Sequence, residues 1–290
     1  MGIARRDFIA VLAGAVLAPG QSASPRIKVG CQTRAYGVPI ADREKLLSVL
    51  DDLVATGYQG FETNYASLQS SFEEPASMRA EFEKRQIKLI GLHGSANFTN
   101  PDNVEKERTQ IDRLAKASKG LGAELLILSS AGVARNPDGR LDSAALKLRC
   151  IELNRAGAAC RALGIRLCTH NHAKEVANDG EEVNAVMART KPDDVAMLMD
   201  AAYVHGAGLS VPAFIRKHHR RIAGIHVRDM RENKEVDMGT GELDFRGIAD
   251  ALRETRWAGW VILEINKRAD TSSRQLVESS RKYMRDVMKI

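Results

Sequence analysis

The strongest constraint on this chain is an eightfold alternation of short apolar runs with longer amphipathic segments between residues 27 and 288. The apolar runs have the length and composition of buried β-strands, and they are Ile27–Gln32, Gln59–Glu62, Lys88–His93, Glu124–Ser129, Arg166–His170, Val195–Asp200, Ile222–Val227 and Val261–Glu264. The segments with helical spacing are Asp42–Ala55, Pro75–Arg85, Val104–Leu121, Ser143–Leu163, Gly180–Arg189, Val211–Lys217, Phe245–Thr255 and Ser272–Met288. This order predicts parallel strands joined by crossover helices.

No stretch rich in Pro, Gly or Ser interrupts the series, so we expect the eight units to form a single domain over residues 24–290. The favoured interpretation is an α/β fold of the (β/α)8 TIM-barrel type, which commonly needs about 250 residues. A doubly wound open sheet is the alternative. Asp142 and Asp244 precede predicted helices and are expected to cap them.

The first 23 residues have the pattern of an export signal rather than of a folded element. Arg5 and Arg6 precede an apolar run from Phe8 to Ala18, and small residues follow up to Ala23. Because a bilayer takes about 20 apolar residues to cross, we expect no stable membrane insertion. The paired arginines resemble a twin-arginine signal. This predicts a bacterial protein that the twin-arginine export machinery carries to the periplasm or the cell exterior.

The charge balance does not point to a nucleic-acid partner. Lys and Arg number 43 against 37 Asp and Glu, which gives a net charge of +6 over 290 residues. Such a surplus is too dilute to indicate nucleic acid without a clustered basic face. The four cysteines form no CxxC motif, and Cys31 and Cys168 lie in predicted strands, so we expect buried thiols there.

Ionisable residues end most of the predicted strands. Acidic residues and histidines are rarely buried unless they are paired or bind a metal. Six strands nevertheless bring them to one face of the predicted barrel, and these are Glu62, His93, the segment His170–Glu175, Asp200, His226 and Glu264. Active sites of such barrels lie at this carboxyl end. We therefore interpret the face as the functional site.

Four of these residues form a candidate metal site. Glu175, Asp200, His226 and Glu264 provide three carboxylates and one imidazole from four consecutive units. Without a cation the carboxylates would repel one another and some would stay protonated. Oxygen ligands with one nitrogen and no sulfur suit Mn²⁺ best here, with Mg²⁺, Co²⁺ or Zn²⁺ as further candidates. The alternative is a metal-free polar mouth that binds a sugar.

Six stretches at strand ends resemble the xylose isomerase-like barrels, often called sugar phosphate isomerases/epimerases, along nearly the whole mature chain. They are Gly57–Glu62, His170–Glu175, Leu198–Asp200, Ile225–Asp229, Gly239–Phe245 and Gly259–Glu264. The resemblance implies one divalent ion held by Glu175, Asp200, His226 and Glu264. It also implies that the two glutamates move protons on the two faces of a sugar substrate.

The chain departs from that family pattern at two positions. The epimerases carry Glu directly at the end of the fifth strand, where this chain has His170, and Glu175 follows five residues later. His172 is thereby added as a candidate catalytic base, or as a residue that orients Glu175. This form resembles metal-dependent lyases that act on 3-keto-glycosides. Arg228 replaces the usual Lys, and a guanidinium can bind or polarise a group but cannot accept a proton.

The remaining polar residues of the mouth are assigned to the substrate. We expect Glu62 and His93 to contact hydroxyl groups, with His170 and Arg228 as further binding residues. Three-zinc nucleases of the same superfamily are disfavoured because Tyr203 stands where they need a histidine and because residues 237–239 lack their Asp-x-His pair.

These observations predict a divalent-metal-dependent isomerase or epimerase of a non-phosphorylated sugar or keto-sugar. Glu175, Glu264 or His172 would remove a proton next to a metal-bound carbonyl, which gives an enediolate. The alternatives are a lyase that deglycosylates 3-keto-glycosides with His172 as base, and a sugar-binding barrel without turnover. The expected partner is a small sugar, and association into a homo-oligomer stays open.

Overall fold

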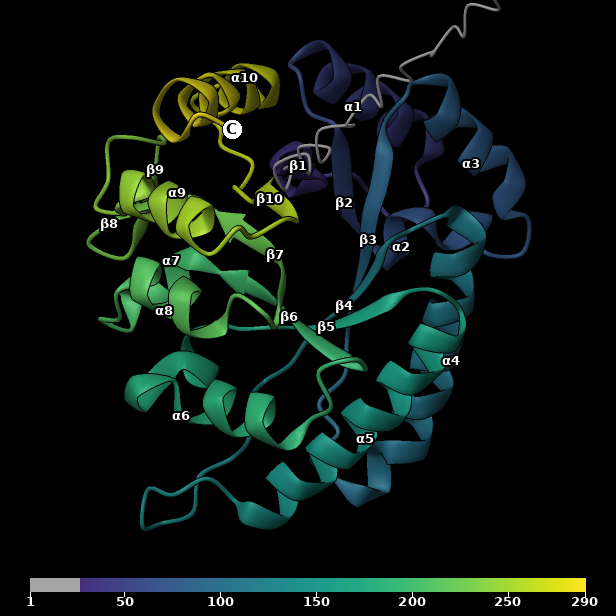
Figure 1. Ribbon diagram of the computed structural model, residues 1–290. Helices are drawn as coiled ribbons and strands as arrows, with labels where there is room; N and C mark the ends of the chain where they lie inside the picture. The colour runs from purple at the N-terminus through teal and green to yellow at the C-terminus, as the bar shows by residue number, and fades with distance from the viewer. Residues whose placement is uncertain (1–26) are drawn as a thin grey trace, which may run out of the picture.

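The computed structural model describes residues 27–290 as a closed parallel β-barrel surrounded by helices (Figure 1). The expected signal segment, residues 1–23, lies outside the described residues. The barrel strands are β1 (Lys28–Gln32), β2 (Gly60–Asn64), β3 (Lys88–Ser95), β4 (Leu125–Ser129), β5 (Arg166–His170), β6 (Val195–Asp200), β7 (Ile222–Val227) and β10 (Trp260–Leu263). β1 pairs in parallel with both β2 and β10, which closes the sheet. The predicted TIM barrel is therefore confirmed, and the open-sheet alternative is wrong.

One major helix follows each barrel strand. These helices are α1 (Arg43–Ala55), α3 (Pro75–Lys84), α4 (Val104–Leu121), α5 (Ser143–Ala162), α6 (Ala173–Arg189), α8 (Val211–His218), α9 (Phe245–Glu254) and α10 (Ser273–Tyr283). The two predicted caps are confirmed, since Asp142 accepts hydrogen bonds from the N–H groups of Ala144 and Ala145, and Asp244 accepts one from Gly247. Such side-chain caps fix where each helix begins.

Several short elements were not predicted, and all of them follow barrel strands. They are α2 (Tyr65–Leu68), α7 (Ala201–Gly206), β8 (Asp229–Arg231) and β9 (Lys234–Val236), with 3-10 turns at Thr33–Tyr36, Gln69–Ser71 and Pro101–Asn103. A π-helical turn, Met284–Met288, follows α10. Three- to six-residue elements bury little apolar surface of their own, so periodicity gives almost no signal for them.

Helix α6 differs from its prediction at its beginning. It starts at Ala173, but residues Ala177 to Gly180 leave helical geometry before it continues to Arg189. Asn178, Asp179 and Gly180 have φ values of 51°, 57° and 72°, a left-handed region that these residue types tolerate best. The predicted helix Gly180–Arg189 corresponds to the part after this break, and the first turn carries Glu175.

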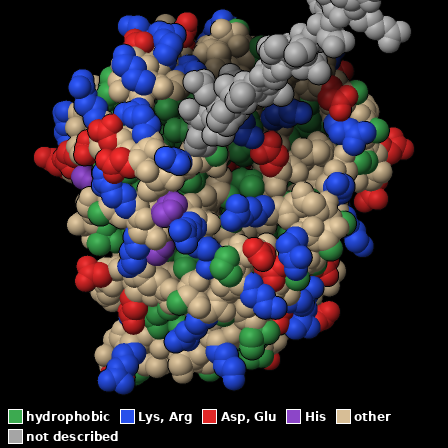
Figure 2. Space-filling view, in the orientation of Figure 1, with side chains coloured by type: hydrophobic (Ala, Val, Ile, Leu, Met, Phe, Trp, Pro, Cys, Tyr) green, Lys and Arg blue, Asp and Glu red, His purple; other side chains and the backbone are tan. Residues whose placement is uncertain are grey.

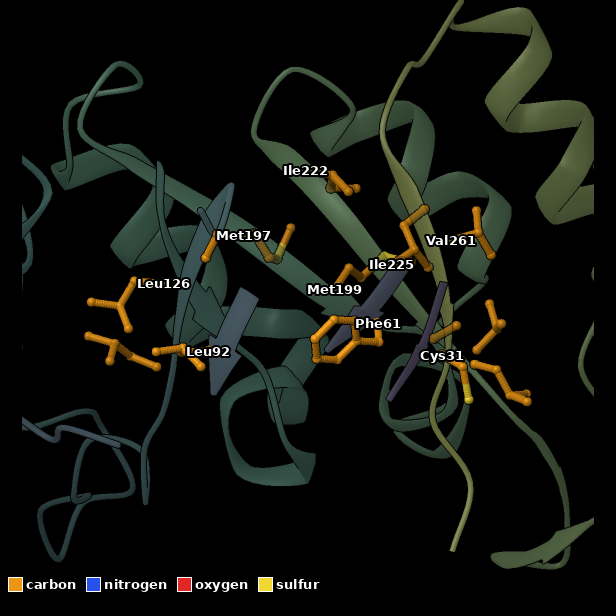
Figure 3. Close-up of a cluster of buried hydrophobic side chains, with 14 of the residues drawn as sticks. Cys31, Phe61, Leu92, Leu126, Met197, Met199, Ile222, Ile225 and Val261 are labelled. Carbon is orange, nitrogen blue, oxygen red and sulfur yellow. The ribbon is translucent and has the colours of Figure 1, made fainter. Parts of the chain in front are cut away.

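Two layers of apolar side chains hold the barrel. Outward-facing residues such as Phe61, Leu126 and Ile225 pack beneath the helices (Figure 3). A smaller cluster fills the barrel interior, and its members are Ile90, Leu125, Ile127, Cys168, Ala196, Leu198, Trp260 and Ile262. Gly60 makes room for the Trp260 ring, since a Cβ there would lie 2.7 Å from it. The filled interior leaves the carboxyl end of the barrel as the place for a site.

The surface shown has mixed charge and the cysteines are buried, as the sequence predicts. On the face in Figure 2, Lys and Arg side chains are interspersed with Asp and Glu. Across the described residues, no helix is both long and apolar enough to cross a membrane. All four cysteines are buried free thiols, as expected for Cys31 and Cys168.

Candidate active site

The site residues lie two positions further along their strands than the residues that fill the barrel interior. His170 comes two positions after Cys168, Asp200 two after Leu198, and Glu264 two after Ile262. Because side chains alternate along a strand, residues two apart point to the same side. The apolar interior therefore continues directly into a polar layer at the carboxyl ends of the strands.

Four residues of this layer converge on one point. His170, Asp200, His226 and Glu264 each offer a ligand atom, and these atoms lie within 4.8 Å of one another. All four side chains are buried. Three of the four expected metal ligands are thus brought together, and His170 is the fourth member where Glu175 was expected. Glu175 lies outside the group.

Glu62 supports this cluster from below. One of its carboxylate oxygens lies 2.7 Å from His226 Nε2 and the other lies 2.7 Å from His93 Nδ1, while His93 Nε2 lies 2.6 Å from Ser129 Oγ. Burial works to raise the pKa of Glu62, but the two imidazoles hold it below its ordinary value. The expected hydroxyl contacts from Glu62 and His93 do not fit this geometry, because Glu62 is fully buried and both residues already use their polar atoms.

The pKa values of the two central imidazoles, His170 and His226, are shifted in opposite directions. His170 Nδ1 lies 3.3 Å from the Leu198 carbonyl oxygen, which can only accept, so Nδ1 carries the hydrogen and Nε2 keeps a lone pair. Burial and the neighbouring His226 lower the pKa of His170 well below its ordinary value. Burial also opposes protonation of His226, but Glu62 and Glu264 raise its pKa well above the ordinary value. The cluster therefore combines a neutral imidazole with one that sits between two carboxylates.

Arg228 lies directly over the carboxylates of the cluster. Its Nη1 is 2.9 Å from Asp200 Oδ2 and 2.7 Å from Glu264 Oε2, and its guanidinium lies 4.8 Å from the centre of the Tyr203 ring. Burial raises the pKa of Asp200 to about 6 despite this cation. Arg228 is thus a counter-ion of the cluster as well as a lining residue of the mouth.

The cluster fits a divalent metal ion. Asp200 Oδ2 and His226 Nδ1 are buried atoms without a well-formed hydrogen bond, and both belong to residues of the cluster. Their neighbours are charged groups, Arg228 Nη1 at 2.9 Å from Asp200 Oδ2 and Glu264 Oε2 at 3.1 Å from His226 Nδ1. A neutral His170 nitrogen and Glu264 complete a set of two nitrogens and two oxygens. Such a set suits Mn²⁺, Co²⁺ or Zn²⁺, and His226 with Glu62 behind it has the arrangement that usually orients a metal-bound imidazole.

Glu175 and His172 form a second pair beside the cluster. The buried Glu175 carboxylate accepts hydrogen bonds from Ser130 Oγ at 2.7 Å and from the His172 N–H at 3.1 Å, and it lies 3.9 Å from His172 Nδ1. Burial opposes ionisation, but these donors hold the pKa of Glu175 below its ordinary value. The His172 side chain is 34% exposed and its ring packs against Tyr203 and His170. Glu175 therefore holds the His172 backbone, and its carboxylate lies near the inner nitrogen of the His172 ring without a hydrogen bond to it.

Asp229 organises the site although the sequence pattern alone indicated no role for it. Its buried carboxylate accepts hydrogen bonds from the N–H groups of Met230, Gly239, Gly241 and Leu243, at 2.8–3.2 Å. The residue thereby gathers the loop that follows β7. The Ile225–Asp229 stretch ends in this aspartate, but only the fold shows which N–H groups its carboxylate reaches.

The mouth of the barrel is a cleft with two lobes. Tyr203, Arg228, Met230 and Asn233 line both of them. One lobe reaches Glu264 and includes Arg34 and Asn266. The other extends over α7. A ligand that enters between the lobes therefore meets Arg228 and Tyr203 on its way to the cluster.

Comparisons with known proteins agree with the fold. The xylose isomerase-like TIM barrel family matches residues 50–287. An inosose dehydratase from Lactiplantibacillus plantarum is 22% identical over 254 residues, which cover 78% of this chain and 82% of that protein. The zinc-bound IOLI protein superposes with a TM-score of 0.74 at 15% identity, over 90% of this chain and 98% of that one. The 3-keto-D-glucoside 4-epimerase YcjR from E. coli superposes with a TM-score of 0.69 at 16% identity, over 91% of this chain and 100% of that one.

Proposed function

This chain belongs to the xylose isomerase-like TIM barrel family, and from that premise we propose that it is a divalent-metal-dependent lyase. Its substrate would be a non-phosphorylated keto-sugar that carries a substituent at the position β to the carbonyl, such as a keto-glycoside. The family contains sugar-modifying enzymes of both lyase and epimerase type, and the inosose dehydratase relative is a dehydratase by name. The choice between these reactions depends on the groups that can move protons.

The observation that carries the proposal is the separation of Glu175 and His172 from the ligand cluster. His172 is part-exposed and packs against Tyr203, which lines the mouth. Glu175 lies beside it with its oxygens held by Ser130 and by the His172 N–H. A part-exposed imidazole with a carboxylate 3.9 Å from its inner nitrogen has the groups that proton transfer requires, and a small movement of the ring would join them. His172 is therefore the proposed base, and Glu175 the residue that positions it.

His170, Asp200, His226 and Glu264 would hold the metal. When bound there, a divalent ion would act as a Lewis acid that polarises the substrate carbonyl and acidifies the adjacent C–H bond. Two of these residues are kept in place by other groups, His226 by Glu62 and Glu264 by Arg228. The chain thus fixes the site before substrate arrives.

The proposed reaction moves one proton through His172. Its imidazole takes the proton from the carbon next to the carbonyl, and the electron pair of that C–H bond becomes the new C=C bond. The bond from the β-carbon to the substituent oxygen breaks, and that oxygen takes a proton from the imidazolium. Tyr203 packs against His172 and limits its rotation. Arg228 lines the mouth beside the cluster, with Nη1 paired to Asp200 and Glu264.

Epimerisation or isomerisation is the second candidate, and one observation favours it. His226 and Arg228 both contact Glu264 Oε2, whereas within residues 27–290 the ion-pair partner of Oε1 is Arg34, at 3.6 Å. This oxygen could return a proton to the other face of the substrate. The first step would be the same, since both reactions begin by removing the proton next to the carbonyl.

Export remains part of the proposal. The paired arginines Arg5 and Arg6 and the apolar run that follows support delivery outside the cytoplasm. Phosphorylated metabolites are mostly intracellular, which is why a neutral sugar is the preferred substrate.

Methanol release from a C3-oxidised methyl glucoside tests the proposed function. The Mn²⁺-loaded full chain should release methanol in D2O, as followed by NMR, and His172→Gln should slow release at least about 100-fold with unchanged metal content. His219→Gln, at the end of α8, is the control and should behave as the parent. Deuterium incorporation with an inverted centre and no methanol would instead support the epimerase. If the chain shows no methanol release and no deuterium exchange, both the lyase and the epimerase are excluded.

A further inference from the structure

The lobe of the cleft over α7 adjoins the site, but most of its lining residues have no role in the site described so far. This α7 lobe is lined by His205, Gly206, Gly208, Glu232 and Glu242, together with residues shared with the other lobe. Its cavity volume is about 460 Å³, and it opens to solvent. Binding clefts for small molecules commonly enclose roughly 300–1,000 Å³. There is room here for a group beyond the one that reaches the cluster.

One wall of the α7 lobe is held rigidly. It is the β8–β9 hairpin, whose two-residue turn Glu232–Asn233 has positive φ at both positions, 49° and 61°. Asp229 ties the base of this loop to four backbone N–H groups. Glu235 accepts hydrogen bonds from both the backbone and the side-chain N–H of Asn266, at 2.8 and 2.9 Å. A wall anchored on both sides can define a subsite before a ligand binds.

Two glycines leave free space at the floor of the α7 lobe. Gly206 and Gly208 line it, and a Cβ at Gly206 would come no closer than 3.6 Å, to Asn233 Oδ1. At Gly208 a Cβ would meet nothing within 4 Å. Residue size therefore decides how much of the lobe a ligand can occupy.

The lining has the chemistry of a sugar site. Tyr203 and Met230 provide apolar surface, and Asn233, His205 and Glu242 provide planar polar groups. Glu242 makes only long contacts, 3.3 Å to the Glu232 N–H and 3.4 Å to His205 Nε2, so its oxygens can accept further hydrogen bonds. Glu232 and Glu242 carry negative charge, while Arg228 is already paired with Asp200 and Glu264. An anionic ligand is disfavoured and a neutral polyhydroxylated ring is favoured.

We propose that the α7 lobe is a subsite for a neutral sugar ring, which would be the substituent that leaves the substrate. This rests on the proposed function, because the ring bound there is the group that elimination releases. The two lobes share Tyr203 and Arg228, so one molecule can span both. The natural substrate is then a keto-glycoside with a second sugar rather than a free monosaccharide.

Titration calorimetry on the Mn²⁺-loaded full chain tests this subsite with glucose, cellobiose and glucose 6-phosphate as probes. Cellobiose should bind at least tenfold more tightly than glucose, and glucose 6-phosphate no more tightly than glucose. Gly206→Leu, which fills the floor, and Glu242→Gln should each remove the advantage of cellobiose while Mn²⁺ affinity stays unchanged. The control is Glu254→Gln, an exposed carboxylate of α9 that pairs with Arg216, and it should keep the advantage.

Equal affinities for glucose and cellobiose would overturn the subsite, as would variants that weaken both sugars alike. Tighter binding of glucose 6-phosphate would replace the neutral ring with an anionic group and would also overturn it. The two proposals fail separately. A chain that releases no methanol but shows the cellobiose advantage retains the subsite and loses the lyase, and the reverse result retains only the lyase.

Discussion

Among single residues, Arg228 has the largest effect on the charge of the cluster, because it neutralises part of the charge of its two carboxylates. It is the cation that contacts both Asp200 and Glu264, and it is almost completely buried. A divalent ion bound by the same carboxylates would lie within a few ångströms of this guanidinium. Two like unit charges about 4 Å apart repel by roughly 4 kcal/mol at an effective dielectric constant of about 20, and a divalent ion doubles that repulsion. Arg228 must therefore move or weaken metal binding.

Replacing Arg228 with methionine should tighten Mn²⁺ binding by about tenfold, or roughly 1.4 kcal/mol. The repulsion between guanidinium and ion disappears, and Asp200 and Glu264 lose their alternative partner. The metal-free variant should be less stable than the parent, since two buried carboxylates are left unpaired. Calorimetric titration with Mn²⁺ and thermal unfolding measure the two effects.

Arg34→Met is the matched control for that substitution. Arg34 lies 3.6 Å from Glu264 Oε1, but its side chain is 57% exposed, so solvent screens its charge. It should change Mn²⁺ affinity less than about twofold, since exposed ion pairs contribute little. Weaker Mn²⁺ binding by Arg228→Met would show that Arg228 assists the site instead of competing for it.

At the scale of elements, the break in α6 places the two proton-handling residues. The first turn begins at Ala173 and carries Glu175 inward, and residues Ala177 to Gly180 then redirect the chain. An uninterrupted helix from this point would carry the chain in another direction. The run Asn178-Asp179-Gly180 is a sequence signal for this break, but the predicted helix contains only its last residue.

Helix α8 carries the clearest titratable group outside the site. His218 near its end is buried against Phe214, with ring centroids 4.4 Å apart, and its Nε2 has no hydrogen-bond partner. Burial, with Lys217 and Arg221 nearby, lowers the pKa of His218 to about 4. Protonation in the folded state would place a charge in an apolar contact.

This helix should lose stability as the pH falls from about 6.5 to 4. In that window the unfolded chain binds a proton at the ordinary histidine pKa, about 6.5, whereas the folded chain does not, so the free energy of unfolding decreases. We expect His218 to account for about 3 kcal/mol of the decrease. Urea unfolding at several pH values, compared between the parent and His218→Phe, measures it. An equally steep decrease in the variant would assign the effect to other groups.

For the whole molecule, barrel closure makes the site and the fold depend on each other. The cluster draws on β5, β6, β7 and the end of β10, and Glu62 on β2 supports it from across the barrel. A ligand that binds only this arrangement stabilises the entire domain. Metal binding should therefore be visible in global unfolding.

Mn²⁺ at about 100 times its dissociation constant should add roughly 2.7 kcal/mol to the free energy of unfolding. For a domain of this size that corresponds to a rise in Tm of about 5–10 °C. Differential scanning calorimetry of chelator-treated protein, with and without Mn²⁺, provides the measurement. Asp200→Asn should abolish most of the rise, whereas Asp193→Asn, on an exposed aspartate before β6, should not. A Tm that is indifferent to Mn²⁺, Co²⁺ and Zn²⁺ would argue against a metal site.

Most of the fold was predictable from local pattern. Each predicted barrel strand and each major helix corresponds to an observed element, because strands and helices bury one face and so repeat apolar residues at fixed spacing. The β8–β9 hairpin and α7, which build the cleft, escaped prediction. They are too short for periodicity and depend on contacts such as those of Asp229, which join residues up to 14 positions apart.

The sequence by itself determined the barrel, the face that carries the site and three members of the cluster, Asp200, His226 and Glu264. These follow from spacing along single strands. Only the tertiary structure decided that His170 rather than Glu175 completes the cluster, that Glu62 lies beneath His226, and that Arg228 bridges two carboxylates. Those facts concern distances between different strands and loops, and such distances are set when the sheet closes and its side chains pack, not by the order of residues along one segment.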